Sequence, residues 1–327
     1  MSEIGGKSNA RGAGLGLLSM AIFATHDVII KHLGQTYSPV QIVFFAALLS
    51  FPLLSVILLN DKREGSLRPV HPGWVIARVI TTVVTGLCAF YAFSTLPLAQ
   101  VYPLLFAMPL LVTVFSIPLL GEKVGIHRWA AVILGLIGVV IVVRPGQSDL
   151  ALGHFAAMTA AVTGALASVI VRRIGSEERS VVLLLSPLLG NVIAMGLSLP
   201  FVWVPLQLPD LGLMAVIAIF GLTASFLQIL AYRAGEAAIV APMQYSQILW
   251  AIFYGWVFFH ESVDLPTLIG AGVVIASGLY IVFREATAHT SDNQPVLRTR
   301  GRSETVTAPR SSILGRVLGL RARNSRS

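Results

Sequence analysis

The sequence predicts an all-α integral membrane protein with ten transmembrane helices, arranged as two inverted five-helix repeats with both termini cytoplasmic. Three observations support this prediction: the long apolar runs, the uneven distribution of Lys and Arg between the two sides, and a match between the two halves of the chain. Of the 327 residues, 55% are hydrophobic and 12% are charged. A soluble domain carries about 25% charged residues, so this composition is typical of a protein embedded in a bilayer.

Apolar runs recur along most of the chain, and each is long enough as an α-helix to cross a bilayer core of about 30 Å. Helices are expected because every backbone N–H and C=O inside lipid must find a partner without water. The first run contains His26 and Asp27 with no small-residue cleavage site after it, so it is interpreted as a retained helix rather than a signal peptide. The predicted spans are 13–33, 38–59, 73–95, 98–119, 127–144, 152–173, 180–203, 211–231, 237–258 and 264–284.

Lys and Arg side chains lie almost entirely on one side of these spans. That side carries the N-terminal segment, four of the connections and the arginine-rich C-terminal segment, whereas the other side carries only Lys31 and Arg144. Cytoplasmic loops are enriched in Lys and Arg, so both termini are expected in the cytoplasm. The net charge of +8 is explained mostly by this cytoplasmic excess together with the arginine-rich C-terminal segment, so no nucleic-acid partner is expected.

The two halves of the chain match each other. Residues 97–146 align with residues 235–285, so that Pro103 pairs with Pro242 and Glu122 with Glu261. Each half has five spans, an odd number, and the second copy therefore enters the membrane upside down. Many secondary transporters build two alternating gates from such inverted repeats, although duplicated helical units also occur in channels and membrane enzymes. The predicted organisation is a cytoplasmic N-terminal tail (1–12), a first repeat (13–145), a second repeat (152–285) and a basic, mostly disordered cytoplasmic tail (286–327).

The matched segments resemble the drug/metabolite transporter superfamily, in the type with two EamA repeats. Each has a proline-containing helix, a turn with Glu122 or Glu261, and a glycine-bearing last helix. This resemblance implies transport of small metabolites through a central cavity. The stretches THDVIIKHLG, YSPVQIVFF and APMQYSQIL also resemble the branch that holds bacterial riboflavin and S-adenosylmethionine uptake transporters. The family implies that the cavity is lined mainly by the spans 13–33, 73–95, 98–119, 152–173, 211–231 and 237–258.

A polar stripe interrupts the apolar run 237–258. At helical spacing, Gln244, Gln247 and Tyr254 fall on one face. Polar side chains within a membrane usually face the bundle interior or a water-filled cavity, and the alternative is that they join helices by hydrogen bonds of about 0.6–2 kcal/mol. The stripe is therefore predicted to bind substrate. Further candidates for the cavity wall are Tyr245, Gln228, Tyr232, Tyr102 and Gln100.

Charged and titratable residues inside the spans have both functional and structural interpretations. His26 is a candidate for proton coupling, because imidazole changes charge between about pH 5 and 8. Asp27 is a candidate partner for Arg78 or for a cationic substrate group, although Asp27 and Arg78 lie at different predicted depths. Arg78 is a substrate-binding candidate that could equally reach the cytoplasmic headgroups, and Lys31 is expected to anchor a helix end at the interface.

Other features are interpreted as structural. Glu122 and Glu261 lie in tight turns and are expected to cap helices or form salt bridges there. Small-residue pairs in the spans 127–144 (Ala131 and Gly135) and 264–284 (Gly272 and Ala276) allow close helix packing. These two spans are assigned to the scaffold or to a possible homodimer contact.

The function predicted from these features is secondary transport by alternating access in a bacterial cytoplasmic (inner) membrane. A cavity rich in Gln and Tyr and poor in charge favours riboflavin uptake. S-adenosylmethionine uptake would need a carboxylate to bind the cationic substrate, and Asp27 is the candidate for it. Export of amino acids or drugs is a third alternative. A membrane enzyme would need clustered catalytic groups, which the scattered histidines do not provide. No Walker motif is present, and the single cysteine, Cys88, lies in an apolar run, so neither a cofactor nor a metal is expected.

Overall fold

The computed structural model describes residues 2–59, 68–122, 124–145, 151–175 and 177–287. Every regular element within these ranges is a helix, as the sequence predicts. Most of the expected C-terminal tail lies outside the described residues. The elements are α1 (Ser2–Leu33), α2 (Pro39–Leu59), α3 (Pro72–Thr95), α4 (Leu98–Leu105), α5 (Ala107–Leu120), α6 (Ile126–Val143), α7 (Leu152–Ile174), α8 (Ser180–Ser198), η1 (Leu199–Phe201), α9 (Leu208–Ala234), α10 (Ala237–Val240), η2 (Ala241–Tyr245), α11 (Ser246–Phe259) and α12 (Leu265–Thr287).

Among the described residues, 8 helical segments are long and apolar enough to cross a membrane, and Pro39–Pro52 forms a shorter apolar helix. These segments match the predicted spans, with one exception at 237–258. The first helix also begins earlier than its predicted span, at Ser2, so it continues through the segment expected as an N-terminal tail. The total of ten spans and the orientation in the membrane stay predictions.

Two of the predicted spans are broken near their middle rather than continuous. The first break is at Phe106, between α4 and α5, where Pro109 cannot donate a backbone N–H to the preceding turn. The second is at Tyr245, where the short 3₁₀ helix η2 gives way to α11. In the repeat alignment Phe106 and Tyr245 are equivalent positions, three residues after Pro103 and Pro242. Discontinuous helices at the repeat interface are typical of transporter substrate sites.

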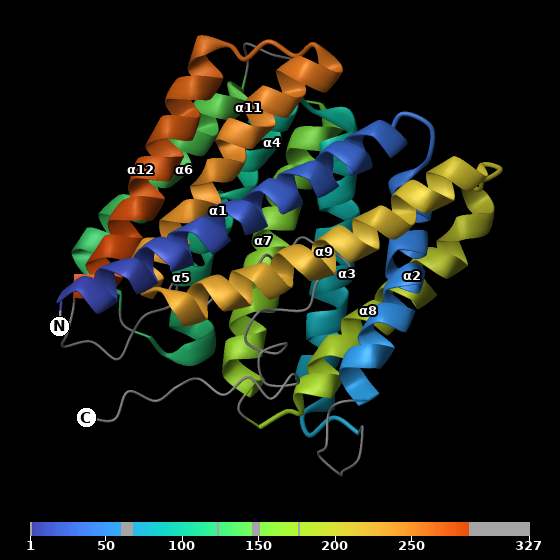
Figure 1. Cartoon of the computed structure of the whole chain (residues 1–327), viewed down its shortest axis with the longest axis horizontal. Coiled ribbons are helices and arrows are strands. Elements are labelled where there is room, and N and C mark those ends of the chain that lie inside the picture. Colours follow the sequence, from blue (N-terminus) through green and yellow to red (C-terminus); the bar gives the residue numbers. More distant parts are fainter. Residues whose placement is uncertain (1, 60–67, 123, 146–150, 176, 288–327) are drawn as a thin grey trace.

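The two repeats interlock across the bundle. Figure 1 shows α1 of the first repeat lying beside α9 of the second, with α6 and α12 paired at one side and α2 and α8 at the other. The helices α6 and α12 approach most closely at two glycines: a Cβ on Gly270 would lie 2.7 Å from the Gly138 carbonyl oxygen, and one on Gly138 would lie 2.9 Å from the Gly270 carbonyl oxygen. These two helices therefore form a tightly packed scaffold within one chain.

The two small-residue pairs assigned to scaffold or dimer contacts have different environments. Ala131 and Gly135 are buried, and Gly135 faces Leu110 and Ser277 inside the chain. Gly272 and Ala276 are exposed, and no atom lies within 4 Å of the position of a Gly272 Cβ. Only the second pair is therefore open to a neighbouring copy, and a homodimer stays a prediction.

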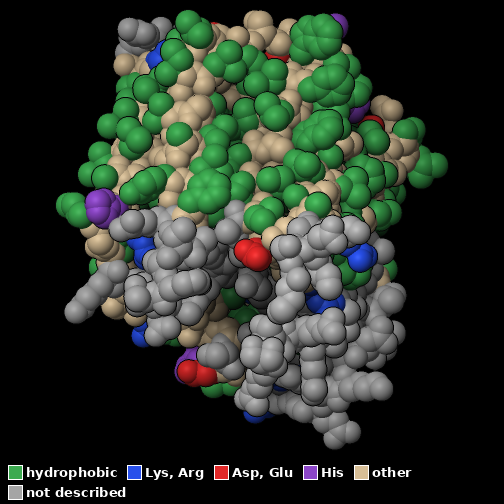
Figure 2. Space-filling model, turned by 60° about the vertical axis from the view of Figure 1, so that its left-hand side comes forward, with side chains coloured by type: hydrophobic (Ala, Val, Ile, Leu, Met, Phe, Trp, Pro, Cys, Tyr) green, Lys and Arg blue, Asp and Glu red, His purple; other side chains and the backbone are tan. Residues whose placement is uncertain are grey.

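The surface of the bundle is that of a lipid-embedded protein. Figure 2 shows a broad area of hydrophobic side chains that charged side chains rarely interrupt. Large apolar residues stand fully outward along the helices, including Ile133 at 55%, Ile193 at 60% and Trp256 at 67% exposure. Hydrophobic side chains that would be unfavourable in water are stable in contact with acyl chains.

Candidate functional site

A polar cluster lies deep in the bundle on α1. Thr25, His26 and Asp27 are consecutive, and their side chains point in different directions because successive residues of a helix are about 100° apart. His26 and Asp27 are both 0% exposed. A carboxylate and an imidazole in this position are costly in a membrane and usually have a function.

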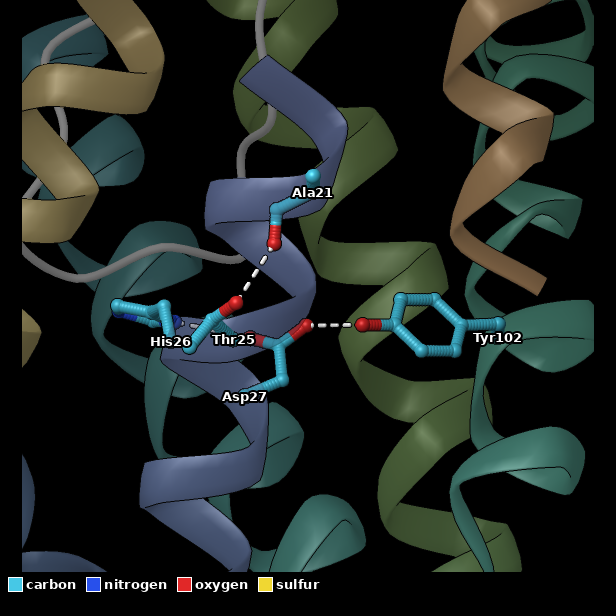
Figure 3. A network of polar contacts seen from close by, with 5 residues as sticks. All are labelled: Ala21, Thr25, His26, Asp27 and Tyr102. Atoms are coloured by element: carbon cyan, nitrogen blue, oxygen red, sulfur yellow. Dashed lines mark hydrogen bonds and ion pairs between the residues drawn. The ribbon is translucent and has the colours of Figure 1, made fainter. Parts of the chain in front are cut away.

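Asp27 is held by two neighbours (Figure 3). The Tyr102 hydroxyl, on α4, donates to Asp27 Oδ2 over 2.5 Å, and His26 Nδ1 lies 2.9 Å from Asp27 Oδ1. An ionised carboxylate only accepts hydrogen bonds. If Asp27 is ionised, the hydrogen bond between the two side chains therefore needs a proton on His26 Nδ1, which donates to Asp27 Oδ1. The geometry therefore fixes the carboxyl group of Asp27 between a phenol and an imidazole.

The second ring nitrogen of His26 makes no hydrogen bond to the described part of the chain. His26 Nε2 is buried and has no hydrogen-bond partner within the described part of the chain, and the Phe90 ring lies edge-on with its centroid 6.2 Å from that of His26. When Nδ1 carries the proton of a neutral imidazole, Nε2 is a basic acceptor.

A row of aromatic rings connects this cluster to the second repeat. Ring centroids are 5.6 Å apart for Phe93 and Tyr102, 6.1 Å for Tyr102 and Phe106, and 5.0 Å for Phe106 and Tyr245. The last contact joins the two equivalent helix breaks. The inverted repeat therefore brings the two helix breaks, at Phe106 and Tyr245, into contact inside the bundle. Phe106 is also the neighbour of Tyr102, which donates a hydrogen bond to Asp27.

Thr25 links α1 to α11. Its hydroxyl donates to the Ala21 carbonyl oxygen over 2.9 Å (Figure 3), so its oxygen accepts the bond from the Tyr254 hydroxyl at 3.1 Å. The Tyr254 ring stacks on Trp250 with centroids 5.9 Å apart. Thr25 is a site residue that the sequence interpretation missed, although it lies directly before His26.

The predicted stripe at 244–254 is only partly formed as expected, because the break at Tyr245 separates Gln244 from the α11 helix. Gln247 is 2% exposed and its Nε2 atom has no hydrogen-bond partner among the described residues. The Tyr245 hydroxyl is likewise buried without such a partner and lies against Gly278, where a Cβ would be 1.8 Å from it. Both side chains therefore lie in the interior of the bundle rather than at its surface.

The remaining candidates lie further from the cluster or only border it. Arg78 is 7% exposed and donates to the Leu183 carbonyl oxygen at the start of α8, so it is not a snorkelling side chain. Gln228 on α9 is buried, while Gln100 on α4 and Tyr232 on α9 are half-buried. Phe93, whose ring lies beside Tyr102, was missed by the sequence interpretation.

Metal binding has no evident place in the described ranges. No three His, Cys, Asp or Glu side chains there come together in a group that could hold a metal ion.

Lys31 differs from the expected interface anchor: it is 8% exposed and its ammonium contacts Glu261 Oε1 at 2.7 Å.

Comparison with known proteins agrees with this architecture. The family model of the EamA-like transporter family matches twice, over residues 10–144 and 151–283. The S-adenosylmethionine uptake transporter of Rickettsia bellii is 25% identical over 284 residues, which cover 86% of this chain and 97% of that protein. The pseudopaline exporter CntI of Pseudomonas aeruginosa is 25% identical over 268 residues, which cover 80% of this chain and 93% of the exporter.

A solved crystal structure supports the fold. It shares 15% sequence identity with a TM-score of 0.52 and covers 83% of this chain and 97% of its own. The two family matches together span more than half of the chain, and the bacterial relatives are transporters. The chain therefore belongs to the EamA-like transporter family, with two EamA repeats, and is a multi-pass transporter of the bacterial inner membrane.

Proposed function

We propose that this transporter carries S-adenosylmethionine into the cell by alternating access, with Asp27 as the group that recognises the positively charged sulfonium. The observation that carries the proposal is the fully buried carboxylate of Asp27, fixed by Tyr102 and His26 beside a row of aromatic rings. A cation is attracted both by a carboxylate in a low-dielectric site and by the faces of aromatic rings. S-adenosylmethionine also carries an adenine ring, which can stack on such rings.

Riboflavin is less well matched to these contacts than the sequence suggested. The riboflavin prediction rested on a cavity rich in Gln and Tyr with little charge. The polar contacts instead centre on an acidic residue, and an uncharged isoalloxazine and polyol offer no positive charge for that residue to attract. The similarity to S-adenosylmethionine uptake transporters favours the same order of preference. Riboflavin is kept as an alternative that the experiment below distinguishes.

His26 supplies the counter-charge when no substrate is bound. A proton on the imidazole neutralises Asp27 in the empty site, and the arriving sulfonium takes over that role as the proton leaves. A bare carboxylate never faces the bilayer interior in this cycle, so the desolvation cost of an isolated charge is avoided. Substrate and proton thus compete for the same negative charge.

Export is the second candidate, because the relative from Pseudomonas aeruginosa is a pseudopaline exporter. Because the repeats are inverted, similar gates are expected at both faces of the membrane. The site itself therefore does not determine the direction in which substrate moves. Direction then follows from the gradients of substrate and proton. Cells preloaded with labelled S-adenosylmethionine would retain it under the import proposal and lose it under the export alternative.

The test is solute flux into proteoliposomes that contain the purified full-length protein. Labelled S-adenosylmethionine should enter in a saturable manner, and excess unlabelled S-adenosylmethionine should block its entry while excess riboflavin should not. Protein-free liposomes give the background. Saturable riboflavin entry without S-adenosylmethionine entry would contradict the proposed substrate and support the alternative. Flux of neither solute would contradict both assignments and leave only the family membership.

A further inference from the structure

Two largely buried ion pairs join the two repeats, one at each end of the bundle. Lys31 at the end of α1 pairs with Glu261, which follows α11. Arg172 at the end of α7 pairs with Glu122, which follows α5. Each pair therefore connects a residue of one repeat with a residue of the other.

The first pair closes the end of the bundle where α1, α3 and α11 finish. The Lys31 ammonium also donates to the Leu96 carbonyl oxygen at 2.5 Å and lies 5.2 Å from the centroid of the Phe259 ring. Glu261 Oε2 accepts the backbone N–H of Leu98, the first residue of α4, at 3.0 Å. This end is thus held by a network of three polar contacts and one cation–π contact.

The second pair closes the end where α5 and α7 finish. The guanidinium of Arg172 contacts Glu122 Oε1, and the neighbouring Arg173 donates to the Leu119 carbonyl oxygen of α5. The side chains of Arg172 and Glu122 are 11% and 15% exposed, close to the 10% and 14% of Lys31 and Glu261. The two pairs are therefore almost equally withdrawn from solvent.

The inverted repeat makes these pairs equivalent. Glu122 and Glu261 are aligned in the two halves. Lys31 and Arg172 each lie two residues before the last residue of the first helix of their repeat, α1 or α7. Because the repeats are inverted, one arrangement of side chains appears twice, at opposite ends of the membrane-spanning bundle.

We propose that the two ion pairs are the latches of alternating access: the Lys31–Glu261 pair opens when the protein exposes its centre at that end, and the Arg172–Glu122 pair opens at the other. Rocking of one repeat against the other separates the helices that each pair joins. Both pairs are formed here, so the structure has both latches closed. The proposal concerns the transport cycle and does not depend on which solute is carried.

The two latches differ in how fully their polar atoms are hydrogen-bonded. Glu261 satisfies both carboxylate oxygens, whereas Glu122 Oε2 is buried with no hydrogen-bond partner in the described ranges. An unsatisfied buried oxygen weakens the closed arrangement. The end closed by Arg172 is therefore the easier of the two to open.

The latches can be tested by distance measurements between spin labels on the full-length protein in lipid nanodiscs, in a Cys88→Ser background. One label pair on His32 and Phe258, both exposed, reports the Lys31 end; the other on Pro118 and Glu177, also exposed, reports the Arg172 end. Lys31→Gln should shift only the first distance distribution to longer values. Arg172→Gln should shift only the second.

Matched controls separate a latch from a general loss of structure. Arg144→Gln removes another interhelical ion pair, with Asp264, between the tightly packed α6 and α12, and should move neither distribution. Lys31→Arg and Arg172→Lys keep the charge and should restore the distributions of the parent protein. Two unchanged distributions, or opening at the same end in both Gln variants, would overturn the proposal, and so would equal opening at both ends.

Discussion

Asp27→Asn is expected to lower S-adenosylmethionine transport about 100-fold. Asparagine keeps the size of the side chain and can still accept the Tyr102 hydrogen bond, but it removes the negative charge that holds the sulfonium. Removing one member of a buried charge pair costs about 2–5 kcal/mol, and about 3 kcal/mol corresponds to roughly a 100-fold change in binding. Initial rates of labelled substrate entry into proteoliposomes measure the effect.

The matched control for this variant is Asp210→Asn. Asp210 also accepts a hydrogen bond from a tyrosine, the hydroxyl of Tyr37 at 2.6 Å, but it lies in the first turn of α9, away from the α1 cluster. Asp210→Asn should leave the transport rate within about twofold of the parent rate, since a polar contact near the surface contributes about 1 kcal/mol or less. Equal rates in the two variants would show that Asp27 has no special role.

Gly270→Ala is expected to lower the thermal unfolding midpoint by about 3–10 °C, because overpacking costs about 1–3 kcal/mol. The new Cβ would lie 2.7 Å from the Gly138 carbonyl oxygen and 3.0 Å from the Val142 backbone nitrogen. These are backbone atoms, so α6 and α12 must move apart to admit the methyl group. Unfolding of the purified protein in detergent, followed by loss of the monodisperse peak on gel filtration, gives the midpoint.

Gly272→Ala provides the control on the same helix. Nothing lies within 4 Å of the Cβ position at Gly272, and alanine favours a helix over glycine by about 1 kcal/mol. Its midpoint should be unchanged or slightly higher. A fall as large as that of Gly270→Ala would show that α12 tolerates no substitution, and the argument from the α6–α12 contact would fail.

The membrane-embedded helical fold follows from the sequence because the bilayer imposes a length and an apolar composition on each span. The repeat alignment was equally direct, since it relied on proline and glutamate positions that recur 139 residues apart (Pro103 and Pro242, Glu122 and Glu261). A kink is the expected effect of Pro103 and Pro109, which flank the break at Phe106, whereas the break at Tyr245 was not foreseen. A proline indicates that a hydrogen bond is lost but not where the helix restarts, and this depends on packing against the other repeat.

For the candidate site, the sequence suggested individual residues but not which of them contact one another. His26, Asp27 and Tyr102 were each candidates, yet the bond between Asp27 and Tyr102 joins residues 75 positions apart, and no helical periodicity relates them. Lys31 was assigned to the interface because charged residues near helix ends usually reach water, whereas in the structure Lys31 is itself buried and pairs with Glu261. Pairings between helices depend on the rotation of each helix about its axis, which the hydrophobic pattern constrains only loosely.

The most direct test of charge recognition by Asp27 is the equilibrium affinity of the purified protein for S-adenosylmethionine relative to S-adenosylhomocysteine. These compounds differ only by the sulfur-bound methyl group and the positive charge it creates. The account predicts that the parent protein prefers S-adenosylmethionine by about 100-fold and that Asp27→Asn binds both compounds with similar, weak affinity. A preference that survives unchanged in Asp27→Asn would contradict the central role of this carboxylate.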